Sequence, residues 1–244
     1  MSQSVDPTRD YYNEFSKRYE DERRPNSASG YHAMIDDLEV EVVERFARGK
    51  SVLECGCGTG LLLERFATFA SEAQGIDLSP GMLSLARKRG LNVQEGSVTS
   101  LPYGNGQFDV TCSFKVLAHV EDIGKAISEM ARVTKPGGVI LAEFYNPYSF
   151  RGLAKRLGPA GKISNETKES AVYTRFDAPW EIAKYLPAGC AIEDRWGVRI
   201  VTPVAQAARL PFVGPLLQRA EQKLANTAAA NLAGFYVAIL RKRA

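Results

Sequence analysis

The stretch Val52–Gly60, with the sequence VLECGCGTG, decides the fold of this chain. A short apolar run ends at the carboxylate of Glu54, and three glycines follow at a spacing of two residues. Glycine accepts a positive φ and lets a ligand approach the backbone without a Cβ in the way. The next residues, Leu61–Phe66, predict a helix. A strand, a glycine loop and a helix in this order form the nucleotide cradle of α/β sheets.

The segments around this stretch alternate between predicted strands and helices. Serine at 79 and proline at 80 are typical of a helix start, and Gly90 is expected to end that helix. Asp122 is expected to cap a further helix, and Lys135–Gly138 to form a turn. Strands are predicted at 51–54, 73–77, 91–95, 108–114 and 139–144, with a helix from the glycine loop to about residue 70. This alternation predicts an α/β fold, a Rossmann-like doubly wound sheet that is mostly parallel and has helices on both faces.

The two flanks of this core are expected to differ from it. Tyr11, Phe15 and Tyr19 recur at helical spacing, and residues 31–48 predict a second helix, so residues 1–49 are expected to form an N-terminal helical cap. Residues 50–244 form the main domain in this prediction, with an irregular insertion at about 145–190. A short helix is expected to begin at Asp177 as its N-cap, and residues 204–232 are expected to be helical.

Composition limits the class of protein. With 244 residues, 45% hydrophobic and 24% charged, the chain suits one globular α/β domain with additions, and its net charge of +3 (31 − 28) does not by itself indicate nucleic acid. The sequence contains neither a signal-peptide pattern nor 18 consecutive apolar residues, so we expect a cytoplasmic protein without a transmembrane segment. The four cysteines are then reduced thiols. Cys55 and Cys57 offer too few ligands at a suitable spacing for a metal, and no metal site is predicted.

Several blocks of the chain together resemble the class I S-adenosylmethionine (SAM) methyltransferases. VLECGCGTG resembles the family's first motif, an acidic residue followed by G-x-G-x-G. The other matching blocks are GIDLSPGML at 75–83, EGSVTSLPY at 95–103, FDV at 108–110 with VLAHV at 116–120, and RVTKPGG at 132–138. They cover about residues 50–145 and are most similar to the small-molecule enzymes of the menaquinone and ubiquinone type. The resemblance also implies that strands at 191–201 and 235–240 form the antiparallel final pair of the sheet.

The resemblance implies SAM as the cofactor and S-adenosylhomocysteine (SAH) as the product. Asp77, 17 residues after Gly60 (77 − 60), stands where a carboxylate accepts both ribose hydroxyls, although it also suits the start of a helix. Glu54 is expected near the methionine amino group, or as a brace for the loop. Ser97 replaces the usual acidic partner of the adenine amino group and accepts that bond more weakly. The expected cofactor-binding residues are Tyr19, Glu54, Gly56, Cys57, Gly58, Gly60, Asp77, Leu78, Met82, Ser97, Val98 and Phe114.

Residues on the acceptor side are expected from the blocks that follow the fourth and fifth strands. His119 is the candidate general base, because its pKa class suits proton transfer at neutral pH; a purely structural histidine is the alternative. The expected substrate-binding residues are Tyr11, Tyr12, Lys115 and Tyr145. The tyrosines of the cap equally suit helix packing, and Lys115 equally suits a solvated position.

The predicted function is methyl transfer from SAM to a small-molecule acceptor, at an oxygen, nitrogen or carbon atom that the sequence does not distinguish. The alternatives are methylation of tRNA or protein, a SAM-fold protein without methyl transfer, and an NAD-dependent oxidoreductase, which the glycine spacing disfavours. No nucleic-acid partner is expected, and the chain is expected to be a monomer or a homodimer. The apolar stretch Val204–Leu217 fits a pocket wall, a dimer face, a weak membrane contact or, most simply, a helix laid over the sheet.

Overall fold

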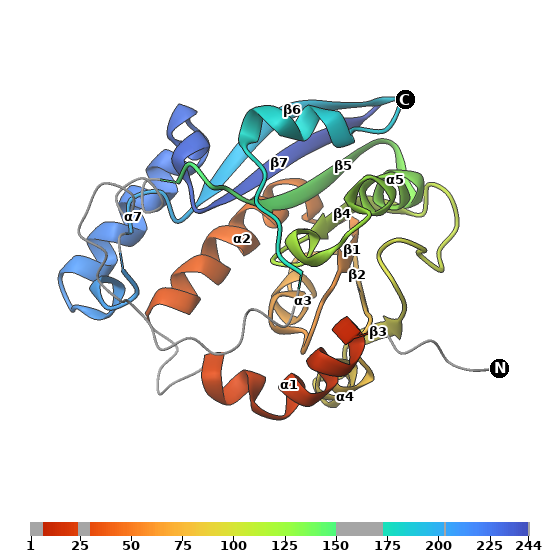
Figure 1. The fold of residues 1–244 in the computed structure, drawn as a ribbon, viewed down its shortest axis with the longest axis horizontal. Coiled ribbons are helices and arrows are strands. Elements are labelled where there is room, and N and C mark those ends of the chain that lie inside the picture. The colour runs from red at the N-terminus through yellow and green to blue at the C-terminus, as the bar shows by residue number, and fades with distance from the viewer. Residues whose placement is uncertain (1–6, 24–29, 150–172, 203, 244) are drawn as a thin grey trace.

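The computed structural model describes residues 7–23, 30–149, 173–202 and 204–243, and these residues form a seven-stranded sheet with helices on both faces (Figure 1). The strand order is β3-β2-β1-β4-β5-β7-β6. The strands are β1 (Ser51–Cys55), β2 (Glu72–Asp77), β3 (Asn92–Glu95), β4 (Phe108–Ser113), β5 (Thr134–Tyr145), β6 (Cys190–Val198) and β7 (Phe235–Lys242).

The pairing of the strands confirms the predicted fold class. Strands β1 to β5 pair in parallel, whereas β7 pairs antiparallel with both β5 and β6. Strand β1 has β2 on one side and β4 on the other, so the order of the strands reverses there. In an open α/β sheet, ligands bind at the carboxyl ends of the strands beside such a reversal.

The helices begin and end largely where the sequence predicts. Ser79 caps α4, with its Oγ 3.2 Å from the backbone nitrogen of Met82, and Asp122 caps α5 by accepting from Lys125 N at 3.0 Å. The helices are α1 (Pro7–Arg23), α2 (Tyr31–Ala47), α3 (Leu61–Phe66), α4 (Pro80–Lys88), α5 (Ile123–Val133) and α7 (Val213–Ala225), with short 3-10 helices η1 (Leu117–His119), η3 (Pro179–Tyr185), η4 (Ala207–Arg209) and η5 (Ala228–Leu232). Within the described residues, no helix has the length and apolarity needed to cross a bilayer.

The sheet separates two hydrophobic cores. Alternate residues of a strand point to opposite faces, and β5 follows this rule, with Val139 and Leu141 in one core and Ile140 and Phe144 in the other. The first core packs against α2, α3 and α7, and the second packs against α5 and η3. Residues at both faces of β1 and β4 are therefore fully covered, which fixes the carboxyl ends of these strands in place.

Four local predictions were wrong. Helix α3 ends at Phe66, before residue 70, because the Thr68 hydroxyl and backbone turn back onto Arg65. The predicted turn Lys135–Gly138 lies inside β5, whose register with β4 is irregular at this point. Residues 204–232 are largely helical, as predicted, but the strand predicted at 191–201 ends at Val198.

Asp177 does not cap a helix, which is the fourth difference. The residue before η3 is Ala178, and the Asp177 carboxylate instead accepts from the Tyr185 hydroxyl at 2.6 Å and from Arg175 Nε at 3.0 Å. A carboxylate with both a phenol and a guanidinium within reach bonds to them rather than to the backbone, and sequence spacing does not reveal these partners.

Asp109 joins β1, β4 and β5 at the edge of the sheet opposite the glycine loop. Its Oδ2 accepts from Ser51 N at 3.0 Å, from Ser51 Oγ at 2.7 Å and from Lys135 Nζ at 2.9 Å. Partial burial opposes ionisation, but these hydrogen bonds outweigh it and lower the pKa of Asp109 to about 2.

We predict that Asp109→Ala lowers the free energy of unfolding by about 2 kcal/mol at neutral pH. Because the folded pKa is depressed, the contribution of Asp109 is present above a pH of about 4 and is lost as the pH falls through about 2. Urea unfolding at several pH values measures the difference, with exposed Asp10→Ala as a control. A difference between wild type and Asp109→Ala that did not depend on pH would contradict this role for the carboxylate.

Candidate active site

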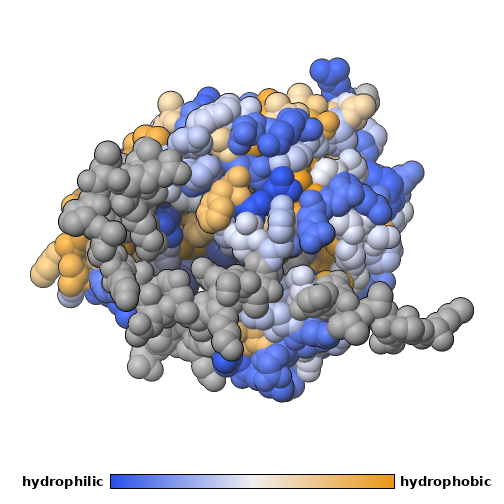
Figure 2. All heavy atoms as spheres, viewed as in Figure 1, coloured by the Kyte–Doolittle hydropathy of each residue, from blue (hydrophilic) through white to orange (hydrophobic). Residues whose placement is uncertain are grey.

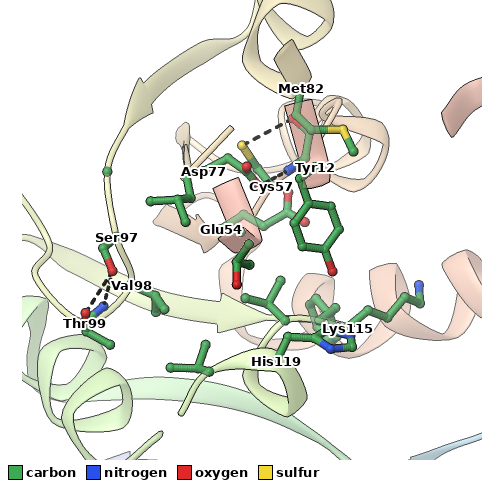
Figure 3. A pocket seen from close by; sticks show the side chains of 18 of the residues that line it. Tyr12, Glu54, Cys57, Asp77, Met82, Ser97, Val98, Thr99, Lys115 and His119 are labelled. Carbon is green, nitrogen blue, oxygen red and sulfur yellow. Dashed lines mark hydrogen bonds between the residues drawn. The ribbon is translucent and has the colours of Figure 1, made fainter. Parts of the chain in front are cut away.

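A cavity of about 770 Å³ opens at the carboxyl edge of β1, β2 and β4. Figure 3 shows Asp77 and Met82 toward one end of the cavity, Lys115 and His119 toward the other, and Tyr12 between them. Fourteen of the seventeen predicted site residues line it: Tyr12, Tyr19, Glu54, Gly56, Cys57, Gly58, Asp77, Leu78, Met82, Ser97, Val98, Phe114, Lys115 and His119. The other three, Tyr11, Gly60 and Tyr145, lie outside the lining.

The glycine loop forms the floor of the cavity. The backbone nitrogens of Gly56 and Cys57 both donate to the Ile76 carbonyl oxygen, at 2.7 and 3.0 Å, which ties the loop to the end of β2. Gly56 has a φ of 82°, and a Cβ there would overlap the side chain of Val116. Gly58 has a φ of 54°, and no atom lies within 4 Å of the position that its Cβ would take. Gly58 therefore leaves room for a ligand against bare backbone.

Asp77 is held at the end of β2 by backbone donors. Its Oδ2 accepts from Gly58 N at 2.8 Å, and its Oδ1 accepts from Ser79 N at 2.9 Å. Burial raises the pKa of Asp77, while these backbone hydrogen bonds oppose the rise. Each carboxylate oxygen has more than one acceptor position, so both oxygens retain capacity for hydroxyl donors in the cavity.

The cysteines of the loop are packed and protonated. Cys55 is fully buried, and Cys57 Sγ lies 2.7 Å from the position that a Cβ on Gly75 would take. Burial raises the pKa of both thiols, so neither is a thiolate at neutral pH. The small size of these side chains lets the loop sit tightly on β2.

Ser97 already takes part in a local turn. Its Oγ accepts from Thr99 N at 3.2 Å and lies 2.8 Å from Thr99 Oγ1. A hydroxyl has two acceptor positions and one donor, so one acceptor position remains when Ser97 donates to Thr99. Thr99 also lines the cavity and was missed in the sequence, because only the resemblance, and no local signal, marked this turn.

Helix α1 is fastened to the start of α4. Asn13 Oδ1 accepts from Ser79 Oγ at 2.7 Å and from Gly81 N at 3.0 Å, and it thereby brings Tyr12 into the cavity. Burial raises the pKa of the Tyr12 phenol, which stays protonated and able to donate. Tyr11 packs edge-on to Tyr12, at 5.2 Å between ring centroids. Asn13 carries the docking contact, and the sequence analysis missed it.

His119 lies toward the end of the cavity away from Asp77, shortly after β4 (Figure 3). Its Nδ1 is 2.9 Å from the Tyr173 carbonyl oxygen, which can only accept. Thr174 Oγ1 lies 3.2 Å from the same nitrogen. A ring that carries its proton on Nδ1 donates to the carbonyl oxygen and leaves the lone pair of Nε2 available. Tyr145 lies beside this ring, at 5.7 Å between centroids, and supports it from outside the cavity lining.

Lys115 is held by ion pairs and a hydrogen bond to carboxyl groups from two elements. Its Nζ is 2.6 Å from Glu39 Oε2 on α2 and 3.5 Å from Asp36 Oδ1, and its backbone nitrogen donates to Glu143 Oε1 on β5 at 2.8 Å. Lys115 has a φ of 59°, a strained value for a residue with a side chain. Burial and the nearby Glu39 charge raise the pKa of Glu143, although Lys115 opposes the rise. The sequence analysis missed Glu39 and Glu143.

These contacts of Lys115 fix the conformation of the turn between β4 and η1. Lys115 is followed by Val116, which packs against Gly56, and the Val116 carbonyl oxygen accepts from His119 N at 2.8 Å. The positions of the glycine loop and of His119 therefore both depend on the conformation of Lys115.

Gly60 has a structural role in this geometry. It stands before α3 with a φ of 83°, and a Cβ there would overlap Leu91 and approach Ala86. The third glycine of the motif is thus required by the packing of α3 near α4 and β3, and it does not line the cavity.

Comparison with known proteins identifies the family. A family described as a methyltransferase domain matches residues 53–142. The ubiquinone biosynthesis O-methyltransferase of Thiobacillus denitrificans is 30% identical over 82% of this chain and 88% of its own length. The chain belongs to the class I SAM-dependent methyltransferases. A demethylmenaquinone methyltransferase of Renibacterium salmoninarum is 40% identical, but over only 41% of this chain and 43% of its own length.

A solved structure from Thermotoga maritima has the same fold. It is described as a SAM-dependent methyltransferase, a possible histamine N-methyltransferase, and superposes with a TM-score of 0.66 at 19% identity over 96% of this chain and 98% of its own. Because the present chain belongs to the SAM-dependent methyltransferases, it uses SAM as its cofactor and yields SAH.

The cavity of the methyltransferase fits this cofactor. Two acidic residues, Glu54 and Asp77, line a site that must receive a sulfonium and an ammonium group, and opposite charges attract strongly in a partly buried site. The open space at Gly58 admits the close approach of a ligand. We propose that Asp77 holds the ribose diol, that Glu54 faces the amino-acid tail and that Met82 and Val98 pack on the adenine.

We predict that Gly81→Ala detaches α1 from α4. The new Cβ would lie 2.6 Å from Ser16 Oγ and 3.1 Å from the Asn13 carbonyl oxygen. Overpacking costs about 1–3 kcal/mol, so calorimetric titration is expected to show SAH affinity reduced about tenfold, with faster proteolysis of α1.

The matched control is Gly124→Ala. Gly124 is the second residue of α5, as Gly81 is of α4, but its Cβ would meet nothing closer than Asp122 Oδ1 at 3.9 Å. SAH affinity should be unchanged in this control. Equal SAH affinities of Gly81→Ala and Gly124→Ala would show that the docking of α1 does not limit cofactor binding.

We predict that two substitutions of Glu143 differ in their effect on the free energy of unfolding. Glu143→Ala leaves the Lys115 N–H without its acceptor and opens a cavity, at a cost of about 3 kcal/mol in unfolding free energy. Near pH 4, Glu143→Gln keeps an acceptor oxygen and is expected to stay within about 1 kcal/mol of wild type.

The pH dependence distinguishes a protonated Glu143 from an ionised one. Because its folded pKa is raised, wild type loses stability as the pH rises above about 4, the ordinary pKa of a glutamate, whereas glutamine does not titrate. Chemical unfolding should show that the free energy of unfolding of Glu143→Gln rises relative to that of wild type as the pH rises. If Glu143→Gln instead became more stable relative to wild type as the pH fell, Glu143 would be ionised in the folded chain.

Proposed function

We propose that this methyltransferase acts on a small-molecule acceptor bound between Lys115 and His119. The observation that carries the proposal is one continuous cavity that reaches from Asp77 to His119. Its volume of about 770 Å³ lies in the range of small-molecule and cofactor sites. Support also comes from the names of relatives, which include ubiquinone biosynthesis O-methyltransferase and demethylmenaquinone methyltransferase.

In this proposal, His119 removes the proton from the acceptor. Bound SAM supplies a methyl group on a sulfonium sulfur, which leaves with the electron pair of the broken C–S bond. The acceptor atom forms the new bond to carbon, and its proton passes to Nε2 of His119. The Tyr173 carbonyl holds the ring in the required tautomer, and Tyr12 helps to exclude water from the methyl group.

The charge of the cavity favours a neutral acceptor over a carboxylate. Glu54, Asp77, Glu121 and Asp122 all line it, and Lys115 is already matched by Glu39 and Asp36. A hydroxyl or amine avoids repulsion from these carboxylates. Residues 1–49 and 145–190 are proposed to shape and cover the acceptor site; residues 150–172 of this insertion lie outside the described part of the chain.

Release of SAH tests the proposal directly. We expect wild type to release SAH with a panel of low-molecular-weight phenols and amines, and not with total tRNA or unfolded protein. His119→Ala is expected to lower kcat by about 10²–10⁴-fold for a hydroxyl acceptor, with SAH affinity unchanged. Turnover confined to tRNA or protein would overturn the small-molecule assignment.

The chain contains a matched control for the histidine, because its only other histidine is His32. His32 is exposed on α2 and does not line the cavity. His32→Ala should keep full activity. Full activity of His119→Ala across the pH range would instead assign His119 a structural role.

Asp77→Ala tests the cofactor site separately. We expect it to weaken SAM and SAH binding by at least about tenfold, as for loss of a charge-assisted hydrogen bond pair. Asp109→Ala is the control, because Asp109 bonds to backbone and side chain at the opposite edge of the sheet. Unchanged affinity of Asp77→Ala would contradict the proposed ribose site.

A further inference from the structure

The segment before and at the start of α7 exposes an unusual group of large apolar side chains. Phe212 is 89% exposed, Leu216 67% and Leu210 52%. Figure 2 shows hydrophobic atoms at the left-hand edge of the molecule, where Figure 1 draws the start of α7. The simplest prediction for Val204–Leu217, a helix laid over the sheet, is therefore wrong for this part of it. We call Leu210, Phe212, Val213 and Leu216 the apolar tip.

The apolar tip is held outward by the fold. Gly214 N donates to the Leu210 carbonyl oxygen at 2.8 Å, and a Cβ on Gly214 would overlap the Ala208 carbonyl oxygen. Phe212 lies inside this close turn, and its side chain is on the outside of the molecule.

Glu221 fastens the same helix from behind. Its buried carboxylate accepts from Ile200 N at 2.6 Å, from Val201 N at 3.0 Å and from Thr202 Oγ1 at 2.7 Å. The second half of α7 is thus fixed to residues 200–202, which follow β6, and the apolar tip lies at the other end of the same helix.

Within the segment 204–225 the exposed charges have one sign, although Asp37 and Glu41 of α2 contact Gln218 and Gln222 farther along α7. Arg209 precedes it, and Arg219 and Lys223 follow Leu216 on the next turns of α7; all three are exposed. The only acidic residue from 204 to 225 is the buried Glu221. Apolar side chains beside arginine and lysine are typical of segments that insert into the interface of an anionic bilayer.

The apolar tip lies near the acceptor side of the molecule. Arg209 Cγ is 3.6 Å from the position that a Cβ on Gly30 would take, at the start of α2. Asp36 and Glu39, which hold Lys115, lie on the same helix within about two to three turns. The apolar tip is therefore connected through α2 to the turn that carries Lys115, beside the proposed acceptor site.

We propose that the apolar tip and its basic neighbours dock this methyltransferase on the surface of an anionic lipid bilayer. Phe212 and Leu216 enter the boundary between headgroups and acyl chains, and Arg209, Arg219 and Lys223 meet the lipid phosphates. The contact is peripheral: α7 lies at the interface and does not span the bilayer.

Vesicle flotation of the full chain tests this proposal. Wild type should float with phosphatidylcholine vesicles that contain phosphatidylglycerol, less with phosphatidylcholine alone, and less at high salt. Phe212→Ser with Leu216→Ser should reduce the bound fraction about tenfold. Arg209→Gln with Arg219→Gln should remove most of the preference for the anionic lipid.

Trp180→Ser is the matched control, because Trp180 is 66% exposed but lies on η3. It should bind vesicles like wild type, and SAH titration shows that each variant is folded. Absence of wild-type binding, or binding that survives the loss of Phe212 and Leu216, would overturn the proposal. Dimers that disappear in the double variant, without vesicle binding, would assign the apolar tip to a second copy of the chain.

Discussion

The join between the glycine loop and the end of β2 is the constraint on which the site depends. Two backbone nitrogens of the loop share the Ile76 carbonyl, and Asp77 returns a carboxylate to Gly58. Because β1 and β2 are neighbours in a parallel sheet, these contacts arise from chain topology alone. They place a carboxylate and open glycine backbone side by side, and cofactor binding follows from this arrangement.

A second group of contacts, around Lys115, fixes the turn after β4 beside the proposed acceptor site. Lys115 holds a strained backbone conformation between carboxyl groups from α2 and β5, and the residues after it carry Val116 to the glycine loop and His119 to the cavity. The cofactor site and the proposed acceptor site therefore share one turn, because the same turn packs on Gly56 and carries the proposed base. The strain at Lys115 costs about 1–3 kcal/mol and is offset by its ionic and backbone partners.

The sequence predicted the alternation of strands and helices in the sheet core and most of the cavity lining, because glycine spacing, caps and family motifs are local signals. It missed Asn13, Glu39 and Glu143, which act through partners that are distant along the chain. It placed Gly60 in the cofactor site, although the structure puts that glycine in the packing near α4. Its simplest prediction for 204–217, a helix laid over the sheet, was wrong for the apolar tip, because periodicity alone does not reveal that these side chains are exposed.

A crystal structure of the complex with SAH tests the central claim most directly, namely that the joint between the loop and β2 forms the cofactor site. The account predicts both ribose hydroxyls on the Asp77 carboxylate, the amino-acid tail over Gly56–Gly58 near Glu54, and the sulfur facing Tyr12 and His119. SAH bound with its ribose away from Asp77, or with its sulfur turned away from His119, would contradict it.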